Sequence, residues 1–79
     1  MKMSNCKIDH SHEDVQKKYQ SQIEFLPNEM TPMFESFFSK EHAQIILNEM
    51  FHLLKKYDLS SEQEKDQRNK QILLLLNKN

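Results

Sequence analysis

Apolar side chains recur every three or four positions through the middle of the chain, which is the spacing of one helix face. The residues of this stripe are Ala43, Ile46, Leu47, Met50, Phe51, Leu54 and Tyr57. The stripe predicts a helix over 40–57, with Ser39 as its N-cap and Glu41 in its positively polarised first turn. Lys55 and Lys56 then fall in the last turn, where cations interact favourably with the helix dipole.

A second stripe precedes this one and consists of Val15, Tyr19, Ile23 and Leu26. It predicts a helix over 12–26, because Ser11 can cap the first turn and Pro27 disfavours helical backbone at the residue before it. Thr31-Pro32 combines a capping hydroxyl with a proline suited to the first helical position. This pair predicts a short helix over 32–38.

The last predicted helix, over 62–76, changes character halfway along. Ser61 and Glu64 form a capping box at its start, and its first half contains no apolar residue. Its second half ends in a run that is apolar on every side. Three residues of this run share one face and can dock on the helix over 40–57: Ile72, Leu75 and Leu76. Leu73 and Leu74 then face away.

Helices joined by such short connections pack roughly antiparallel, so the pattern predicts an all-α bundle of three to four helices. The chain has 79 residues, enough for one domain, which we place at 11–79. Residues 1–10 are polar and aperiodic, and we expect them to form a disordered tail. The sequence contains no glycine, which excludes glycine-rich phosphate loops and dinucleotide-binding fingerprints.

Composition also bounds where the protein acts. Cys6 is the single cysteine, so no intramolecular disulfide is expected. The first residues lack the apolar stretch of a signal peptide. The longest apolar run is far shorter than the ~20 residues that a membrane-spanning helix needs. We therefore expect a cytoplasmic protein without membrane association, and the abundance of Lys, Asn, Gln and Ile suggests a bacterial source.

Groups that could carry catalysis or bind a metal are sparse. Cys6, His10 and His12, with neighbouring carboxylates, form one cluster of metal-capable side chains, but they lie in or beside the predicted tail. A structural zinc site needs four ligands on a held backbone, so we predict no metal site and no cofactor. His42 and His52 fall about 15 Å apart along the predicted helix and cannot share a ligand. Because no nucleophile, base and orienting group can be assembled, we do not expect an enzyme.

Charge argues against nucleic acid as a partner. Eleven basic and twelve acidic residues give a net charge of −1, whereas nucleic-acid binders usually carry a basic face. The last helix does contain side-chain types that read base edges: Gln63, Gln67, Arg68, Asn69, Lys70 and Gln71. A helix-turn-helix-like DNA-binding regulator is therefore one alternative, although Glu62, Glu64 and Asp66 would repel phosphates.

Surplus apolar side chains indicate either further packing in the core, with Leu73 and Leu74 beneath the first helix, or contact with a protein partner. The aromatic segment over 32–38 holds more large side chains than one short helix can bury, and the leucine run leaves two leucines over. Ile45 and Leu53 widen the stripe of the helix over 40–57 at its margins. The candidate contact residues are Met33, Phe37, Phe38, Ile45, Leu53, Leu73 and Leu74, and the pattern leaves open which of Phe37 and Phe38 is buried.

We therefore predict a small interaction protein, such as an adaptor, inhibitor or anti-activator, that binds a partner protein stoichiometrically through its helices. Delivery of that partner to a protease is one form this role could take. An acidic rim around Glu35, Glu41 and Glu49 would steer the encounter. The main alternative is a homodimeric structural module, joined through the last helix and the helix over 40–57.

Overall fold

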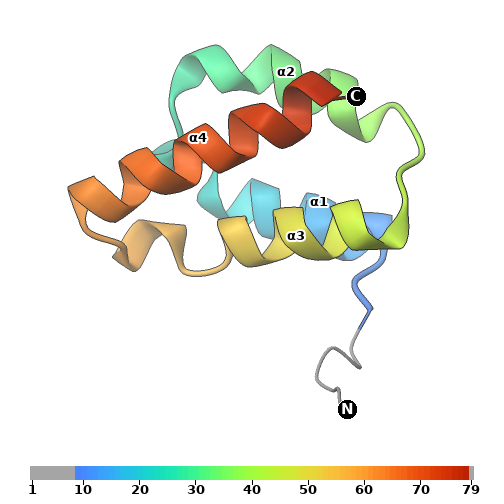
Figure 1. The fold of residues 1–79 in the computed structure, drawn as a ribbon, viewed down its shortest axis with the longest axis horizontal. Coiled ribbons are helices and arrows are strands. Elements are labelled where there is room, and N and C mark those ends of the chain that lie inside the picture. The colour runs from blue at the N-terminus through green and yellow to red at the C-terminus, as the bar shows by residue number, and fades with distance from the viewer. Residues whose placement is uncertain (1–8, 79) are drawn as a thin grey trace.

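Four α-helices and three short 3-10 turns make up most of the computed structural model, which describes residues 9–78 (Figure 1). The α-helices are α1 (His12–Gln22), α2 (Thr31–Phe38), α3 (Gln44–Leu54) and α4 (Glu62–Lys78). The 3-10 turns are η2 (Ile23–Phe25), η3 (Asn28–Met30) and η4 (Tyr57–Leu59). No strand occurs in the described part of the chain. The predicted all-α bundle is therefore confirmed.

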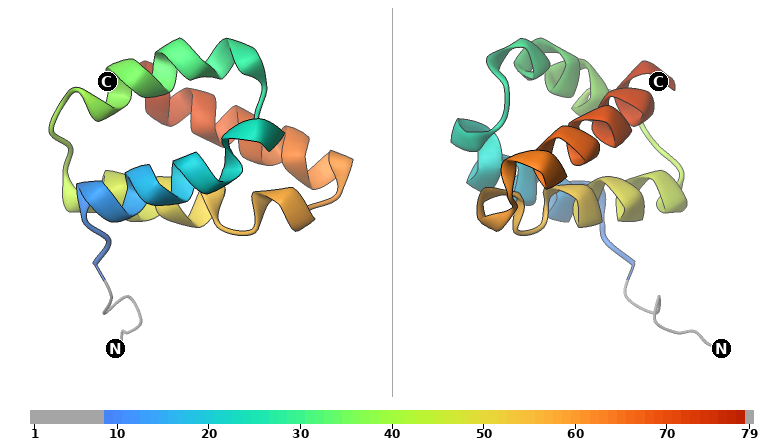
Figure 2. Two further views of the ribbon diagram at one scale, coloured as in Figure 1. Left: turned by 180° about the vertical axis from the view of Figure 1, so that it is seen from behind. Right: turned by 60° about the vertical axis from the view of Figure 1, so that its left-hand side comes forward.

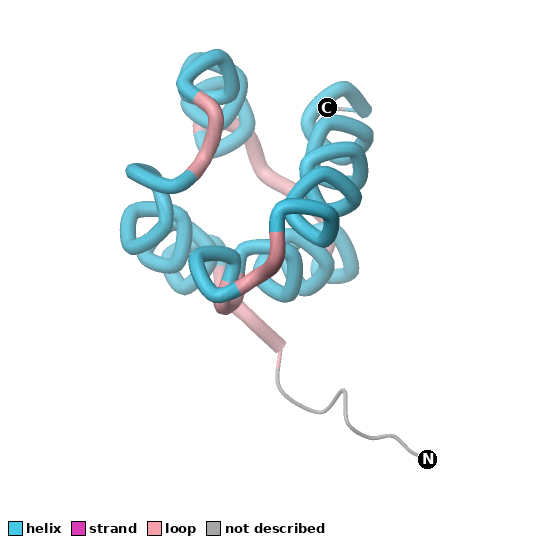
Figure 3. The backbone as a smooth tube through the Cα atoms, turned by 90° about the vertical axis from the view of Figure 1, so that its left-hand side faces the viewer, coloured by secondary structure: helices cyan, strands magenta, loops and turns pink. Residues whose placement is uncertain are grey.

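The helices form two pairs that enclose the interior. α1 and α3 lie side by side along one side of the molecule, and α2 and α4 lie along the other (Figures 1 and 2). Seen end-on, the four helices surround a common centre (Figure 3). α4 runs back across α3 in the opposite direction, so these two helices together form the face that is turned toward the viewer in Figure 1.

Buried side chains from all four α-helices form one core. Its most deeply buried members are Tyr57, Phe34, Met50, Leu54, Ile72 and Val15. At its centre Phe34 stacks on Tyr19, with 4.3 Å between the ring centroids, and lies 6.0 Å from Phe38. The core face predicted for the last helix is confirmed, because Leu75 and Leu76 are buried together with Ile72.

Both tyrosines are expected to titrate above the pH of an exposed tyrosine. Burial raises the pKa of Tyr57 and of Tyr19 above the ordinary 10.0, and nearby carboxylates add to the rise. Since the unfolded chain ionises first, the stability that the neutral phenols contribute is complete below pH 10. It is lost as the pH rises through the folded pKa values. Absorbance of tyrosinate during an alkaline titration should show this delay, and the delay should vanish in denaturant. Identical folded and denatured titrations would contradict it.

α3 is shorter than the helix predicted over 40–57, and its two ends are formed differently. It begins at Gln44 with Ala43 as an uncapped N-cap, so Ser39 is not its cap and Glu41 is not in its first turn. The Ser39 hydroxyl instead donates to the Ser36 carbonyl of α2. The physical reason is a contact with the preceding helix: His42 stacks flat on Phe37 of α2, with 3.8 Å between centroids, which holds 40–43 in a non-helical connection.

The other end of α3 stops before the two lysines that were predicted in its last turn. Lys55 is the C-cap, and Lys56 adopts the left-handed conformation with φ of 58°. A left-handed residue is a common way to end a helix, and glycine usually takes this position. This chain has no glycine, so Lys56 adopts the left-handed conformation despite the steric cost to a residue with a Cβ atom. The backbone then turns into η4.

The starts of α1 and α4 are as predicted, whereas the end of α1 and the start of α2 are not. The hydroxyls of Ser11 and Ser61 accept hydrogen bonds from the first turns of α1 and α4. α1 gives way to η2 at Ile23, and the tighter turn rotates that side chain outward, so it is 40% exposed instead of in the core. Thr31 is the first residue of α2 and not its cap, since Met30 occupies the N-cap position without a side-chain bond.

Candidate functional site

A shallow groove of about 380 Å³ runs between α3 and α4 on the face that these helices share. The residues that line it are Glu49, His52, Leu53, Arg68, Gln71 and Leu75. Its floor is apolar, because Leu53 and Leu75 meet there, and its rim carries the polar and charged groups. We call this feature the α3–α4 groove. A concave apolar floor with a polar rim is the usual form of a binding site.

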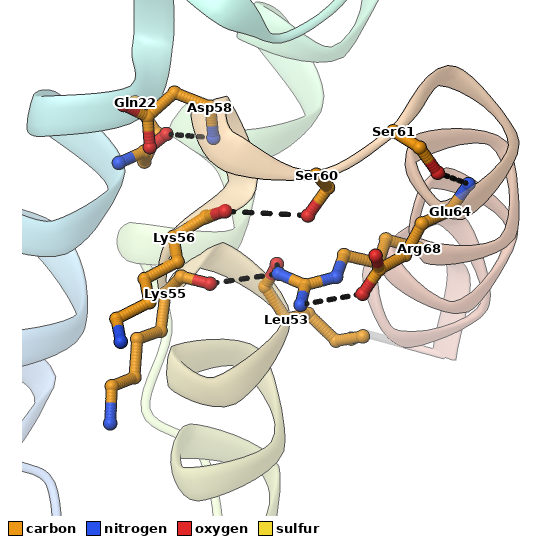
Figure 4. Close-up of polar contacts among 9 residues, drawn as sticks. All are labelled: Gln22, Leu53, Lys55, Lys56, Asp58, Ser60, Ser61, Glu64 and Arg68. Atoms are coloured by element: carbon orange, nitrogen blue, oxygen red, sulfur yellow. Dashed lines mark hydrogen bonds and ion pairs between the residues drawn. The ribbon is translucent and has the colours of Figure 1, made fainter.

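Arg68 closes one end of the groove and joins its two walls. Its Nη1 donates to the carbonyl oxygens of Leu53, at 3.2 Å, and Lys55, at 2.8 Å (Figure 4). Its Nη2 pairs with a carboxylate oxygen of Glu64 at 3.1 Å, one turn earlier on α4. The guanidinium therefore satisfies backbone carbonyls at the end of α3, which no helical amide can reach. The two bonds from Arg68 to these carbonyls set the separation between the end of α3 and α4.

Two further hydrogen bonds hold the α3–α4 connection in place. Oε1 of the buried Gln22 accepts a hydrogen bond from the Asp58 amide at 2.9 Å, which links η4 to the end of α1 (Figure 4). The Tyr57 phenol donates to Asn69 Oδ1 at 2.7 Å, which ties η4 to α4. The connection is thus bonded on both sides, and the walls of the groove are positioned before any partner arrives.

Two strongly exposed apolar residues flank the groove. Ile45 is 66% exposed and lies one turn before Glu49 on α3. Leu74 is 58% exposed and lies one turn after Gln71 on α4. Residues three or four apart on a helix are surface neighbours, so each of these side chains lies beside a residue that lines the groove. We call the groove together with these two residues the α3–α4 face.

The structure brings together three of the seven residues predicted to contact a partner. Ile45, Leu53 and Leu74 belong to the α3–α4 face. Met33, Phe38 and Leu73 are half-buried and pack against the core elsewhere. Phe37 requires a correction, because it is 2% exposed and belongs to the core, which leaves it nothing to offer a partner. Of the two neighbouring phenylalanines, Phe37 is therefore the buried one.

Three exposed apolar residues did not emerge from the sequence as contact candidates. Ile23, Phe25 and Leu59 lie in the 3-10 turns η2 and η4, which the bond between Gln22 and Asp58 links. Leu59 is 75% exposed. An apolar residue within a polar connector was a signal for it. Ile23 and Phe25 carried no such signal, because the helical stripe placed Ile23 in the core.

His10 and His42 serve packing roles. His10 stacks on Phe51 with 3.6 Å between centroids, its amide donates to Asn48, and its carbonyl accepts from Gln44. The predicted tail over 1–10 falls mostly outside the described residues, and its last two residues are held against α3 in this way. Among residues 9–78, no three His, Cys, Asp or Glu side chains gather as a metal site would require, and Cys6 lies outside this range.

The side chains predicted to read DNA bases are in part occupied. Arg68 caps the end of α3, and Asn69 accepts the Tyr57 phenol, so neither is available to a base edge. The first turn of α4, where a recognition helix contacts bases, carries Glu62 and Glu64. These contacts weigh against the DNA-binding alternative.

Comparison with protein-family models, with curated proteins and with solved structures found no match for this chain. In the described residues, none of the helices has the length and apolar character required to span a bilayer. A function must therefore be inferred from the surface of the molecule, where the α3–α4 face is the candidate site.

Proposed function

We propose that this protein is a small, non-enzymatic interaction module of the bacterial cytoplasm that binds an apolar helical surface of another polypeptide through its α3–α4 face. The observation that carries the proposal is the pair of exposed residues, Ile45 and Leu74, beside an apolar groove whose walls are already held by Arg68. Such a surface matches the helix-in-groove mode of recognition, in which apolar anchors one turn apart supply the affinity.

Burial supplies the driving force for this association. Complete burial of a leucine or isoleucine side chain contributes about 1.5–3 kcal/mol relative to exposure. The polar rim of Glu49, His52 and Gln71 keeps the free surface hydrated and fixes the orientation of the partner. A stoichiometric complex of this kind suits an adaptor, an inhibitor or an anti-activator, and delivery of a bound regulator to a protease is one form of it.

Replacing both flanking residues with aspartate should abolish binding. A tagged Ile45→Asp/Leu74→Asp chain should retain a stoichiometric partner from host lysate about tenfold or more less efficiently than the wild type, because two apolar anchors are lost and two carboxylates must be desolvated. The retained polypeptides are identified by mass spectrometry, and the untagged chain itself counts among them. Circular dichroism confirms that the variant is folded, as expected for exposed positions.

The matched control is Phe25→Asp/Leu59→Asp, which changes two exposed apolar residues in η2 and η4, outside the groove and its flanks. This variant should retain the partner as the wild type does. Equal loss with both variants would point to nonspecific adhesion, and the proposal would also fail if the wild type retained no polypeptide in stoichiometric amount.

A further inference from the structure

We infer that the occupant of the α3–α4 face is a second copy of this chain, in a dimer whose two-fold axis runs along the α3–α4 groove. The inference deepens the proposed function and rests on it, since it names the partner for the same surface. A two-fold interface requires that one surface be complementary to itself. The α3–α4 face meets this requirement in shape and in charge.

The shape complementarity arises because the exposed side chains and the groove between them lie on the same face. Ile45 and Leu74 project from the two edges, and the apolar floor of Leu53 and Leu75 lies between them. A two-fold axis along the groove places α3 of each copy over α4 of the other. Ile45 of each copy then meets the edge where Leu74 of the other projects. The apolar side chains on the two edges are exposed to water in the monomer, and in the dimer they cover each other.

The charges are distributed to match the same arrangement. Glu49 is the sole formal charge on α3, and from Gln67 onward the charged residues of α4 are all basic. Glu49 lines the groove one turn after Ile45 on α3, and the exposed Lys70 lies one turn before Leu74 on α4. Within residues 9–78, neither Glu49 nor Lys70 belongs to an ion pair. Laying α3 over α4 of the other copy brings each Glu49 toward a Lys70, twice in every dimer.

The helix directions support the same axis. α3 and α4 run in opposite directions within one chain, and a rotation about the groove preserves direction along it. Each α3 therefore lies antiparallel to the α4 that it covers, which opposes the two helix dipoles favourably. An axis across the groove would instead lay α3 on α3 and bring the two Glu49 carboxylates together.

The experiment is sedimentation equilibrium of the full chain over a concentration series from micromolar to millimolar. We expect the mass to rise from the 9.6 kDa of one chain to twice that value. Glu49→Lys alone and Lys70→Glu alone should each weaken the dimer about tenfold, because like charges then face each other, and the double variant should restore it. Glu29→Lys, on the exposed surface of η3, is the matched charge control and should change nothing.

A chain that stays monomeric throughout the series overturns the inference, and so does a dimer that is indifferent to both single charge reversals. Either result is separable from failure of the proposed function. A monomer that still retains a different polypeptide, and loses it in Ile45→Asp/Leu74→Asp, overturns only the second copy as occupant. A dimer that the two aspartates leave intact, together with no retained polypeptide, overturns both.

Discussion

Replacing Phe34 with alanine should destabilise the fold by about 3–5 kcal/mol, the cost of truncating a fully buried phenylalanine. Phe34 has no solvent exposure and stacks on Tyr19 at the centre of the core. The substitution removes that stacking and leaves a cavity where α1 and α2 meet. A domain of this length has a total stability of roughly 4–12 kcal/mol, so this one change consumes a large part of it. Urea denaturation followed by circular dichroism measures the loss.

The matched control for this prediction is Phe25→Ala, the same chemical change at a residue that is 43% exposed. Since water already surrounds nearly half of this ring, its loss should cost only about 1–2 kcal/mol. Equal destabilisation by the two alanine substitutions would mean that Phe34 is not in the centre of the core.

Arg68→Ala should have the second largest effect, a loss of about 2 kcal/mol. Hydrogen bonds from a charged donor contribute about 1.5–3 kcal/mol, and Arg68 makes two of them to carbonyls at the end of α3. Its ion pair with Glu64 adds little, because that carboxylate is 52% exposed and water screens the interaction. The backbone contacts, and not the ion pair, should dominate the result.

Two companion variants separate these contributions in the same denaturation experiment. Glu64→Gln removes the ion pair alone and should cost less than about 1 kcal/mol. Arg68→Lys should remain well below the wild type, because an ammonium cannot span two carbonyls and a carboxylate as the planar guanidinium does. If Glu64→Gln cost as much as Arg68→Ala, the carbonyl contacts would have been overvalued.

These two effects bear on the proposed function in different ways. Phe34 maintains the fold as a whole, whereas Arg68 holds α3 and α4 at a set separation beside the groove. Loss of Arg68 in a chain that still folds should therefore loosen the α3–α4 face without removing Ile45 or Leu74. A prearranged surface binds more tightly because less conformational entropy is lost on association.

Local pattern was sufficient for the architecture. Each α-helix was predicted from an apolar stripe or from a capping pattern at its start. Ser11 and Ser61 cap the helices that they were predicted to cap. These signals depend on residues within one or two turns of each other, so they can be read without knowing which helices become neighbours. The buried face of α4 followed from the same periodicity.

The candidate site could be predicted only in part. Ile45 followed from surplus apolar residues on α3 and Leu74 from those on α4, but their position on either side of one groove depends on how the two helices cross. Arg68 had been considered as a DNA contact, because nothing in its neighbourhood reveals that the end of α3 lies within its reach. Leu59 and Phe25 are exposed because of turns whose geometry no stripe describes.

By itself, the sequence determined the helical class, the caps Ser11 and Ser61 and the buried sides of α3 and α4, because backbone periodicity and side-chain capping act over a few residues. The tertiary structure alone decided which apolar residues were covered. It buried Phe37 beneath His42, turned Ile23 outward while Gln22 went inward, and ended α3 at a left-handed lysine. The last two outcomes involve segments distant in the chain, because Gln22 accepts a hydrogen bond from the Asp58 amide and Arg68 donates to carbonyls at the end of α3, and only the packed fold brings these segments together.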